Sequence, residues 1–220
     1  MKTKRPSKEV VEALRRFPTS LLSDVLDQMG VEGTITHILP ISTNVKIAGP
    51  ALTVRSIAGD LGTADIKELG VGRILDEAHP GDVIVFDLGG RSHASTWGEL
   101  ASLAAKVKGI EGVVIDGACR DVDEIREEGF PVFTRSVVPR SGKTRVKMLD
   151  INVPIQCGEV MVRPGDIIVG DGTGVVAIPP DRAEEAVKIA ERLEEIEERE
   201  REELLKGRSF SEIMRKYRHF

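Results

Sequence analysis

Apolar positions change their spacing along the chain, and each change predicts a different element. In residues 7–17 and 21–29 they recur every three or four positions, which predicts two amphipathic helices. Residues 45–57 contain short β-branched runs around a Gly-Pro pair, and these predict two strands or one bent strand. The pattern over residues 65–78 is helical again and stops before a Pro-Gly-Asp turn.

The middle of the chain alternates between strand and helix patterns. Continuous apolar runs of strand length occupy residues 83–87, 113–116 and 131–133. Helical patterns over residues 96–108 and 121–128 separate them. This order predicts parallel strands joined by right-handed crossovers, with the sheet covered on both faces.

The last third of the chain predicts short strands and then one long helix. Turn residues separate apolar runs at 151–155, 160–162, 167–169 and 175–178. A charged helix is expected over residues 181–206, and its narrow apolar stripe indicates a solvated helix rather than a partner-binding coil. We expect a single α/β domain over residues 1–220, with an N-terminal helix or arm (1–19) and a C-terminal helical extension (181–220).

Composition narrows the class of protein. The 220 residues include 40% hydrophobic and 30% charged residues, with a formal net charge of −5 and no polybasic run. Such a balance is typical of a globular protein and argues against nucleic acid as the main partner. No apolar run approaches the ~18 residues of a membrane span, and the charged first residues lack an apolar signal core. The expected location is the cytoplasm. The two lone cysteines, Cys119 and Cys157, indicate buried apolar residues rather than a metal pair.

The segment Trp97-Gly98-Glu99-Leu100-Ala101 opens one of the predicted helices and has the character of an anion site. A helix start presents free backbone N–H groups, and Gly98 allows a ligand to approach closely. A carboxylate on the amides of Leu100 and Ala101 would lie at the positive end of the helix dipole.

The ends of two strands should lie beside this helix start. Asp87 and Asp116 end neighbouring predicted strands, at the edge of the sheet where α/β proteins bind ligands. Arg120 follows in the next loop and could grip the same carboxylate with its planar guanidinium. It could equally pair with Asp116 or Glu124, and spacing alone leaves both interpretations open.

Two carboxylates near Arg120 suggest a metal. Asp121 begins one short helix and Glu99 begins the neighbouring one. One carboxylate, waters and a chelating 2-oxo acid are typical of Mg²⁺, which retains much of its hydration. The histidines are scattered, with only His93 in a candidate loop, and no His/Cys cluster suggests zinc.

At these residues the chain resembles the 4-hydroxy-4-methyl-2-oxoglutarate aldolases. That family also contains the regulator of ribonuclease activity A proteins and chains often mislabelled as demethylmenaquinone methyltransferases. The shared motif is an acidic residue, twenty intervening positions and Arg-Asp, which here is Glu99 followed by Arg120-Asp121. The likeness covers roughly residues 20–193 and includes three further stretches: Ser23-Asp24-Val25-Leu26-Asp27, Pro139-Arg140-Ser141-Gly142-Lys143, and Pro164-Gly165-Asp166 through Gly174-Val175-Val176-Ala177-Ile178-Pro179.

The resemblance implies a three-layer swivelling β/β/α fold with a central, largely parallel sheet and a long C-terminal helix, assembled as homotrimers or hexamers with sites between subunits. It implies that Arg120 and the amides near Leu100 hold pyruvate, and that Asp121 ligates Mg²⁺ or Mn²⁺. Glu99 stands where many members have Asp and would act through a metal-bound water. The ribonuclease regulators typically lose the Asp after the Arg, whereas this chain keeps it.

The expected function is therefore a metal-dependent pyruvate aldolase acting on 4-hydroxy-2-oxo dicarboxylic acids, with oxaloacetate decarboxylation through the same pyruvate enolate. Gly98, Leu100, Ala101 and Arg120 are the expected substrate-binding residues, and Arg120, Glu99 and Asp121 the catalytic ones.

Specificity would come from loops such as residues 56–62 and from a neighbouring subunit. Arg55, Arg91 or Lys143 could serve a second anion on the substrate. Two alternatives remain. One is a non-catalytic regulator that contacts a ribonuclease. The other is a methyltransferase, for which the Gly89-Gly90 pair is a weak nucleotide-binding signal.

Overall fold

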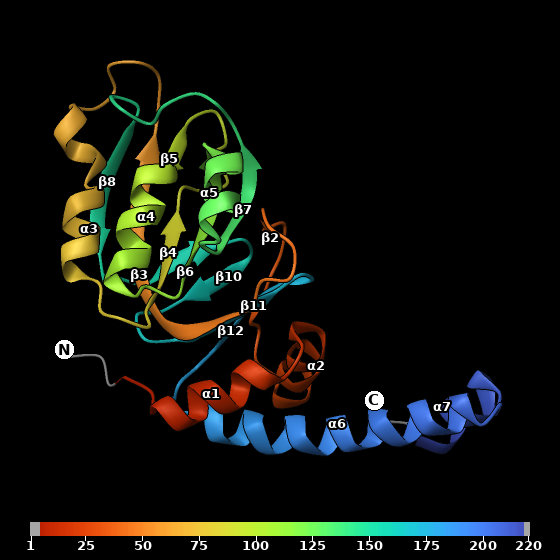
Figure 1. The fold of residues 1–220 in the computed structure, drawn as a ribbon. Helices are drawn as coiled ribbons and strands as arrows, with labels where there is room; N and C mark the ends of the chain where they lie inside the picture. Colours follow the sequence, from red (N-terminus) through yellow and green to blue (C-terminus); the bar gives the residue numbers. More distant parts are fainter. Residues whose placement is uncertain (1–4, 218–220) are drawn as a thin grey trace.

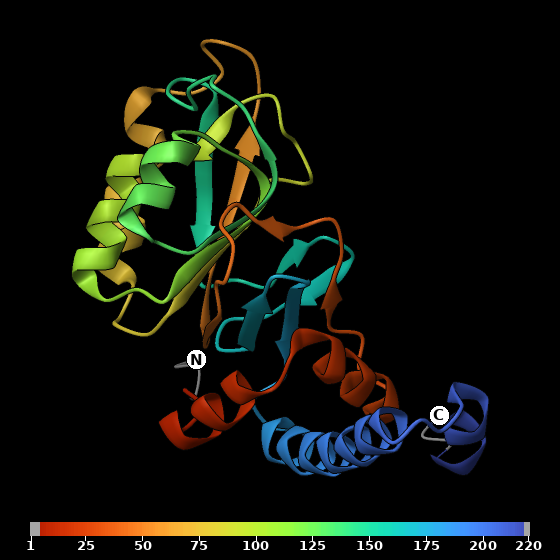
Figure 2. The ribbon, with the colours of Figure 1, turned by 45° about the vertical axis from the view of Figure 1, so that its right-hand side comes forward.

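The protein is a mixed α/β structure, seen in a computed structural model that describes residues 5–217. Figure 1 shows α3, α4 and α5 side by side against one face of a large sheet. A second group of helices, α1, α2 and α6, forms a separate layer at the end of the sheet in both views (Figures 1 and 2). The predicted fold class, with its central sheet and long C-terminal helix, is confirmed.

The large sheet runs in the order β1-β12-β11-β3-β4-β6-β7-β2, with β5 and β8 attached to β6 and β3. Its centre is parallel because helices connect β4, β6 and β7, and its flanks are antiparallel. The strands are β1 (Thr34–Ile35), β2 (Leu39–Pro40), β3 (Ile47–Ala58), β4 (Val83–Asp87), β5 (Ser95–Trp97), β6 (Gly112–Cys119), β7 (Val132–Val137), β8 (Val146–Ile151), β9 (Ile155–Cys157), β10 (Val160–Val162), β11 (Ile167–Asp171) and β12 (Gly174–Ile178).

Six of the helices in the described residues form the two groups described above, and η1 and α7 lie outside these groups. The helices are α1 (Lys8–Arg16), α2 (Thr19–Met29), the 3₁₀ helix η1 (Ile66–Leu69), α3 (Val71–Glu77), α4 (Glu99–Lys108), α5 (Val122–Glu128), α6 (Ala183–Leu205) and α7 (Phe210–Tyr217). None of them, within the described part of the chain, is long and apolar enough to cross a membrane.

Alternation along the central strands explains how both faces of the sheet are covered. In β4, Ile84 and Phe86 belong to the core beneath α3, α4 and α5. Val83 and Val85 belong to the core on the opposite face, beneath the two-stranded β9–β10 hairpin. A strand buried on both faces needs apolar residues at every position, and this requirement produced the continuous runs in the sequence.

Several predicted boundaries differ from the structure. The segment predicted over residues 45–57 is one long strand, β3 (Ile47–Ala58), with a register shift between Arg55 and Ser56 where it pairs with β8. The helix predicted over residues 65–78 is split into η1 and α3, because Gly70 between them adopts a left-handed φ of 70°. The short strand β5 and the helix α7 were not predicted.

The apolar stripe of α6 packs against the protein's own N-terminal helices. Ala186, Ala190 and Leu193 are buried in a core shared with α1 and α2. Beyond this core α6 projects from the body, and α7 folds back against its end (Figure 2). The hydroxyl of Tyr217 in α7 donates to Glu203 in α6 at 2.9 Å. The prediction of a solvated helix therefore holds only for the outer half of α6.

Asp166 lies in the Pro-Gly-Asp turn before β11 and couples stability to pH. Its carboxylate accepts a hydrogen bond from the Arg163 amide at 2.7 Å, and burial raises its pKa from 3.8 to about 6. The folded protein thus binds this proton more tightly than the unfolded chain. The stabilisation is complete below about pH 4 and is lost as the pH rises through about 6.

We expect Asp166→Asn, which keeps an acceptor oxygen, to remove this dependence. Between about pH 4 and pH 7 the wild type should lose on the order of 1–2 kcal/mol of unfolding free energy relative to the variant. Urea denaturation across this range measures the difference. Parallel stability curves for the two proteins would contradict the assignment.

Candidate active site

The carboxyl ends of β4 and β6 do bring Asp87 and Asp116 together, as register partners. Neither lies at the start of α4, where the ligand was predicted to bind, which corrects the prediction, and Asp87 instead lines a separate hollow with Arg55 and Arg91. Asp116 is 3% exposed, pairs with Arg135 at 2.6 Å and accepts the Gly158 amide at 2.9 Å. Asp87 accepts the Gln156 amide at 3.3 Å. Both carboxylates therefore anchor the β9–β10 hairpin on the face opposite α4.

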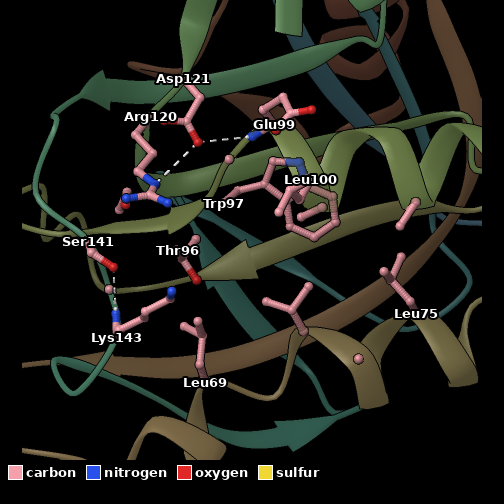
Figure 3. Close-up of a pocket in the computed structure, with 17 residues that line it drawn as sticks. Leu69, Leu75, Thr96, Trp97, Glu99, Leu100, Arg120, Asp121, Ser141 and Lys143 are labelled. Carbon is pink, nitrogen blue, oxygen red and sulfur yellow. Dashed lines mark hydrogen bonds and ion pairs between the residues drawn. The ribbon is translucent and has the colours of Figure 1, made fainter. Parts of the chain in front are cut away.

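A pocket opens on the other face, at the start of α4. It has a volume of about 390 Å³, and its lining includes the predicted catalytic, metal and pyruvate-binding residues Gly98, Glu99, Leu100, Ala101, Arg120 and Asp121. Figure 3 shows these side chains around the opening. The lining residues are Leu69, Val71, Gly72, Leu75, Ser95, Thr96, Trp97, Gly98, Glu99, Leu100, Ala101, Ala104, Arg120, Asp121, Ser141, Gly142 and Lys143.

The first turn of α4 leaves amides directed at this pocket. The Ser102 amide makes the first bond back along the chain, to the Gly98 carbonyl at 3.1 Å. The amides of Leu100 and Ala101 precede it, so no carbonyl of the first turn accepts their hydrogens. The Glu99 amide donates to the Asp121 carboxylate at 3.2 Å. Asp121 thus occupies the Glu99 amide, while the amides of Leu100 and Ala101 remain as two donors for a second anion.

Arg120 and Asp121 reach the same place from the end of β6. The Arg120 amide donates to the Trp97 carbonyl at 3.0 Å, which ties this loop to β5. Asp121 has a left-handed φ of 57°, a conformation that Asp tolerates better than most residues. Arg120 Nε lies 3.3 Å from Asp121 Oδ2. Arg120 therefore pairs with neither Asp116 nor Glu124 and stays about one-third exposed in the pocket.

Gly98 is needed for this arrangement. A Cβ at position 98 would lie 2.5 Å from Asp121 Oδ2 and 3.4 Å from Arg120 Nε. The first distance is closer than side chains allow, so any larger residue would push the Asp121 carboxylate away from α4. The glycine in the Trp-Gly-Glu motif thus admits both the protein's own carboxylate and a ligand.

The sequence analysis missed the opposite wall of the pocket. It comes from η1 and α3, which supply Leu69 and Leu75, and from the loop containing Ser141 and Lys143 (Figure 3). The sequence marks Lys143 as the end of a stretch that matches the family and as one of three possible cations for a second anion, but it does not place that stretch in the pocket wall. Thr96, 4% exposed, lies on β5, a strand too short to predict.

The oxygen donors in the pocket suit a hard divalent cation. Residues 5–217 contain no group of three or more His, Cys, Asp or Glu side chains able to hold a metal. The available donors are the carboxylates of Asp121 and Glu99, and Asp121 is engaged through Oδ2. A set this small fits Mg²⁺ or Mn²⁺, which bind through few carboxylates and keep several waters.

Other titratable candidates lie outside the pocket. The His93 ring is bonded to the Gly59 carbonyl at 2.9 Å, and His93 is not a lining residue. Cys119 and Cys157 are both fully buried. Burial raises the pKa of the Cys119 thiol to about 11 and that of Cys157 well above its usual value, so neither provides a thiolate nucleophile.

Comparison with known proteins places this chain in a family. A family model described as RraA-like, Aldolase/RraA, matches residues 19–177. The chain belongs to the RraA-like family. A relative from Halalkalibacterium halodurans, which bears the provisional name 4-hydroxy-4-methyl-2-oxoglutarate aldolase, is 38% identical over 185 residues, covering 84% of this chain and 83% of the relative.

Solved structures of similar sequence share the fold. An uncharacterised protein from Pseudomonas syringae pv. tomato superposes with a TM-score of 0.89 at 29% identity, covering 99% of this chain and 98% of the other. Streptomyces coelicolor RraAS2, described as an unusual member of the RNase ES inhibitor RraA protein family, gives a TM-score of 0.82 at 28% identity, with 90% and 98% coverage. The expected resemblance is confirmed, and the RraA-like family includes proteins named for both lyase and inhibitor functions.

Proposed function

We propose that the protein is a divalent-metal-dependent carbon–carbon lyase. It would cleave 4-hydroxy-2-oxo dicarboxylic acids to pyruvate and decarboxylate oxaloacetate. The observation that supports this most directly is the convergence of Arg120, Asp121 and the first turn of α4 on one pocket. An inhibitor acting only through surface contacts has no need of a pocket with this set of donors.

In this proposal the carboxylate of the substrate binds at the positive end of α4. The amides of Leu100 and Ala101 donate to it, and the Arg120 guanidinium completes its coordination. The Arg120 backbone is bonded to Trp97 and its Nε lies 3.3 Å from Asp121 Oδ2, so the guanidinium is oriented toward the pocket before the substrate binds. When the carbon–carbon bond breaks, Arg120 lies close enough to stabilise the negative charge that develops on the pyruvate fragment.

Asp121 would hold the cation, and Glu99 would position a water within the same pocket. A bound Mg²⁺ or Mn²⁺ supplies Lewis-acid polarisation of the keto oxygen. Glu99, whose own backbone amide donates to the Asp121 carboxylate, can orient a water that carries the proton to or from the substrate. Trp97, Leu69 and Leu75 form the apolar part of the wall of the same pocket.

A screen of 4-hydroxy-2-oxo acids and oxaloacetate, with pyruvate as the readout, tests the proposal. We expect pyruvate release with MgCl₂ or MnCl₂, its loss with EDTA and its recovery when metal is restored. If no oxo acid yields pyruvate with either metal while a stoichiometric protein partner is captured, the inhibitor function of the kind named for RraAS2 would replace the lyase.

A further inference from the structure

One cation in the pocket has no part in the proposed chemistry. Lys143 lies across the opening from Asp121, and Figure 3 shows its ammonium group directed to the same region as the Arg120 guanidinium. No ion pair joins Lys143 to any residue in the described range 5–217. Of the three cations considered for a second anion, Arg55 pairs instead with Asp150, and Arg91 donates to the Ala58 carbonyl.

The backbone that carries Lys143 is firmly held. The Lys143 amide donates to the Ser141 hydroxyl at 3.1 Å, and the Ser95 amide donates to the Arg140 carbonyl at 2.9 Å. A Cβ on Gly142 would lie 2.1 Å from the Ser95 carbonyl, so only glycine lets this loop approach β5 so closely. The loop is therefore a fixed part of the pocket wall, and the backbone of Lys143 has a defined position in it.

A hydroxyl lies between the two cations. Thr96 is 4% exposed, and its oxygen faces the pocket between Arg120 and Lys143 (Figure 3). No hydrogen bond joins the Thr96 side chain to another described residue, and its hydroxyl is open to the pocket rather than enclosed in the core, so it can take a partner from a ligand there. A ligand oxygen placed beside Lys143 would supply that partner.

Charge indicates what kind of ligand fits. The pocket contains two cationic side chains, Arg120 and Lys143, and two anionic ones, Glu99 and Asp121, so its side chains are neutral in sum. A divalent cation on Asp121 leaves two positive charges to be balanced. A substrate with two carboxylates matches that charge, whereas a 2-oxo monocarboxylate leaves Lys143 without a counter-ion.

We propose that Lys143, together with the Thr96 hydroxyl, binds the distal carboxylate of the substrate and selects dicarboxylic over monocarboxylic 2-oxo acids. This inference rests on the proposed function, since it assigns the second anionic group of the same substrate. Lys143 is a specificity-determining residue here, and Arg120 remains the anchor of the first carboxylate.

Binding affinities measured by calorimetry in the presence of Mg²⁺ test the role of Lys143 without requiring turnover. The probes are 2-oxoglutarate and 2-oxopentanoate, which have equal chain lengths and differ in the distal carboxylate, with pyruvate as the anchor alone. We expect the wild type to bind 2-oxoglutarate about tenfold more tightly than 2-oxopentanoate, the effect of one charge-assisted hydrogen bond. Lys143→Gln should reduce this preference to about twofold or less, with pyruvate affinity unchanged.

Two further variants make the result specific. Lys143→Arg should retain most of the preference because it keeps the charge. Lys147→Gln removes the same charge from β8, outside the pocket, where the lysine pairs with Glu68, and should retain all of it. Preference for 2-oxoglutarate that survives Lys143→Gln would overturn this inference alone. Failure of pyruvate to bind with either metal would overturn the proposed function and this inference with it.

Discussion

Replacing Arg120 with alanine is expected to lower kcat/KM for oxaloacetate by about 10²–10³-fold, the cost of losing one preorganised charge-stabilising donor. Arg120 is the only cation next to the α4 amides among the described lining residues, so no neighbour can replace it. The loss should appear in kcat as well as KM, because the guanidinium opposes charge that grows as the bond breaks.

Two variants separate this effect from a general change of charge. Arg120→Lys keeps the positive charge but loses the planar fork, and should recover only part of the activity. Arg73→Ala removes an exposed arginine from α3, between lining residues but outside the pocket, and should be neutral. Steady-state kinetics with a pyruvate-coupled assay measures all three. Wild-type turnover by Arg120→Ala would remove Arg120 from the site.

The second large effect is expected for Asp121→Asn, with loss of metal-dependent turnover by about 10²-fold or more. The amide keeps the size of the side chain and an oxygen that can accept the Glu99 amide, so the start of α4 should persist. It loses the negative charge that a hard cation requires. The affinity for Mn²⁺, measured by calorimetry or electron paramagnetic resonance, should fall in parallel with activity.

The control for Asp121→Asn is Asp123→Asn, two residues along in α5. The Asp123 side chain is 89% exposed, and its ion pair with Arg126 is a surface contact worth little. This variant makes the same change of charge and should keep full activity. Full metal-dependent turnover by Asp121→Asn would show that the cation is held elsewhere.

The sequence predicted the elements that bring Glu99, Arg120 and Asp121 together. The apolar runs that begin β4, β6 and β7 are recognisable because strand positions buried on both faces of a sheet are apolar. The motif of glycine followed by a helix predicted where an anion could bind, and the pocket lies there.

Two features of the site could not be predicted from the spacing of apolar and polar residues. Asp87 and Asp116 were placed in the ligand crevice, although they share a face with Val85 and Val114 beneath the β9–β10 hairpin. The residues that alternate with them along these strands face the helices instead. The β9–β10 hairpin lies some 40 positions further along the chain, at residues 155–162, so local spacing cannot show which face of the sheet it covers. The Ser141–Lys143 wall was missed for the same reason, since its position depends on contacts with β5.

Membership of the RraA-like family alone does not separate a lyase from an inhibitor, because relatives are named for both. The residues that line the pocket are what can distinguish a lyase from an inhibitor. This chain has an Asp directly after Arg120, held within 3.3 Å of it, and a glycine at position 98 that leaves room for the carboxylate.

The carboxylate of Asp121 also has a structural role. Its Oδ2 accepts a hydrogen bond from the Glu99 amide, the first of α4, and lies beside Arg120 Nε. A lineage that abandoned the chemistry would still need a polar acceptor there to keep two helices in alignment. Asparagine meets that need and a hydrophobic residue does not, so loss of catalysis can precede any loss of architecture. A protein that lost the proposed chemistry in this way would keep the surface around the starts of α4 and α5 unchanged.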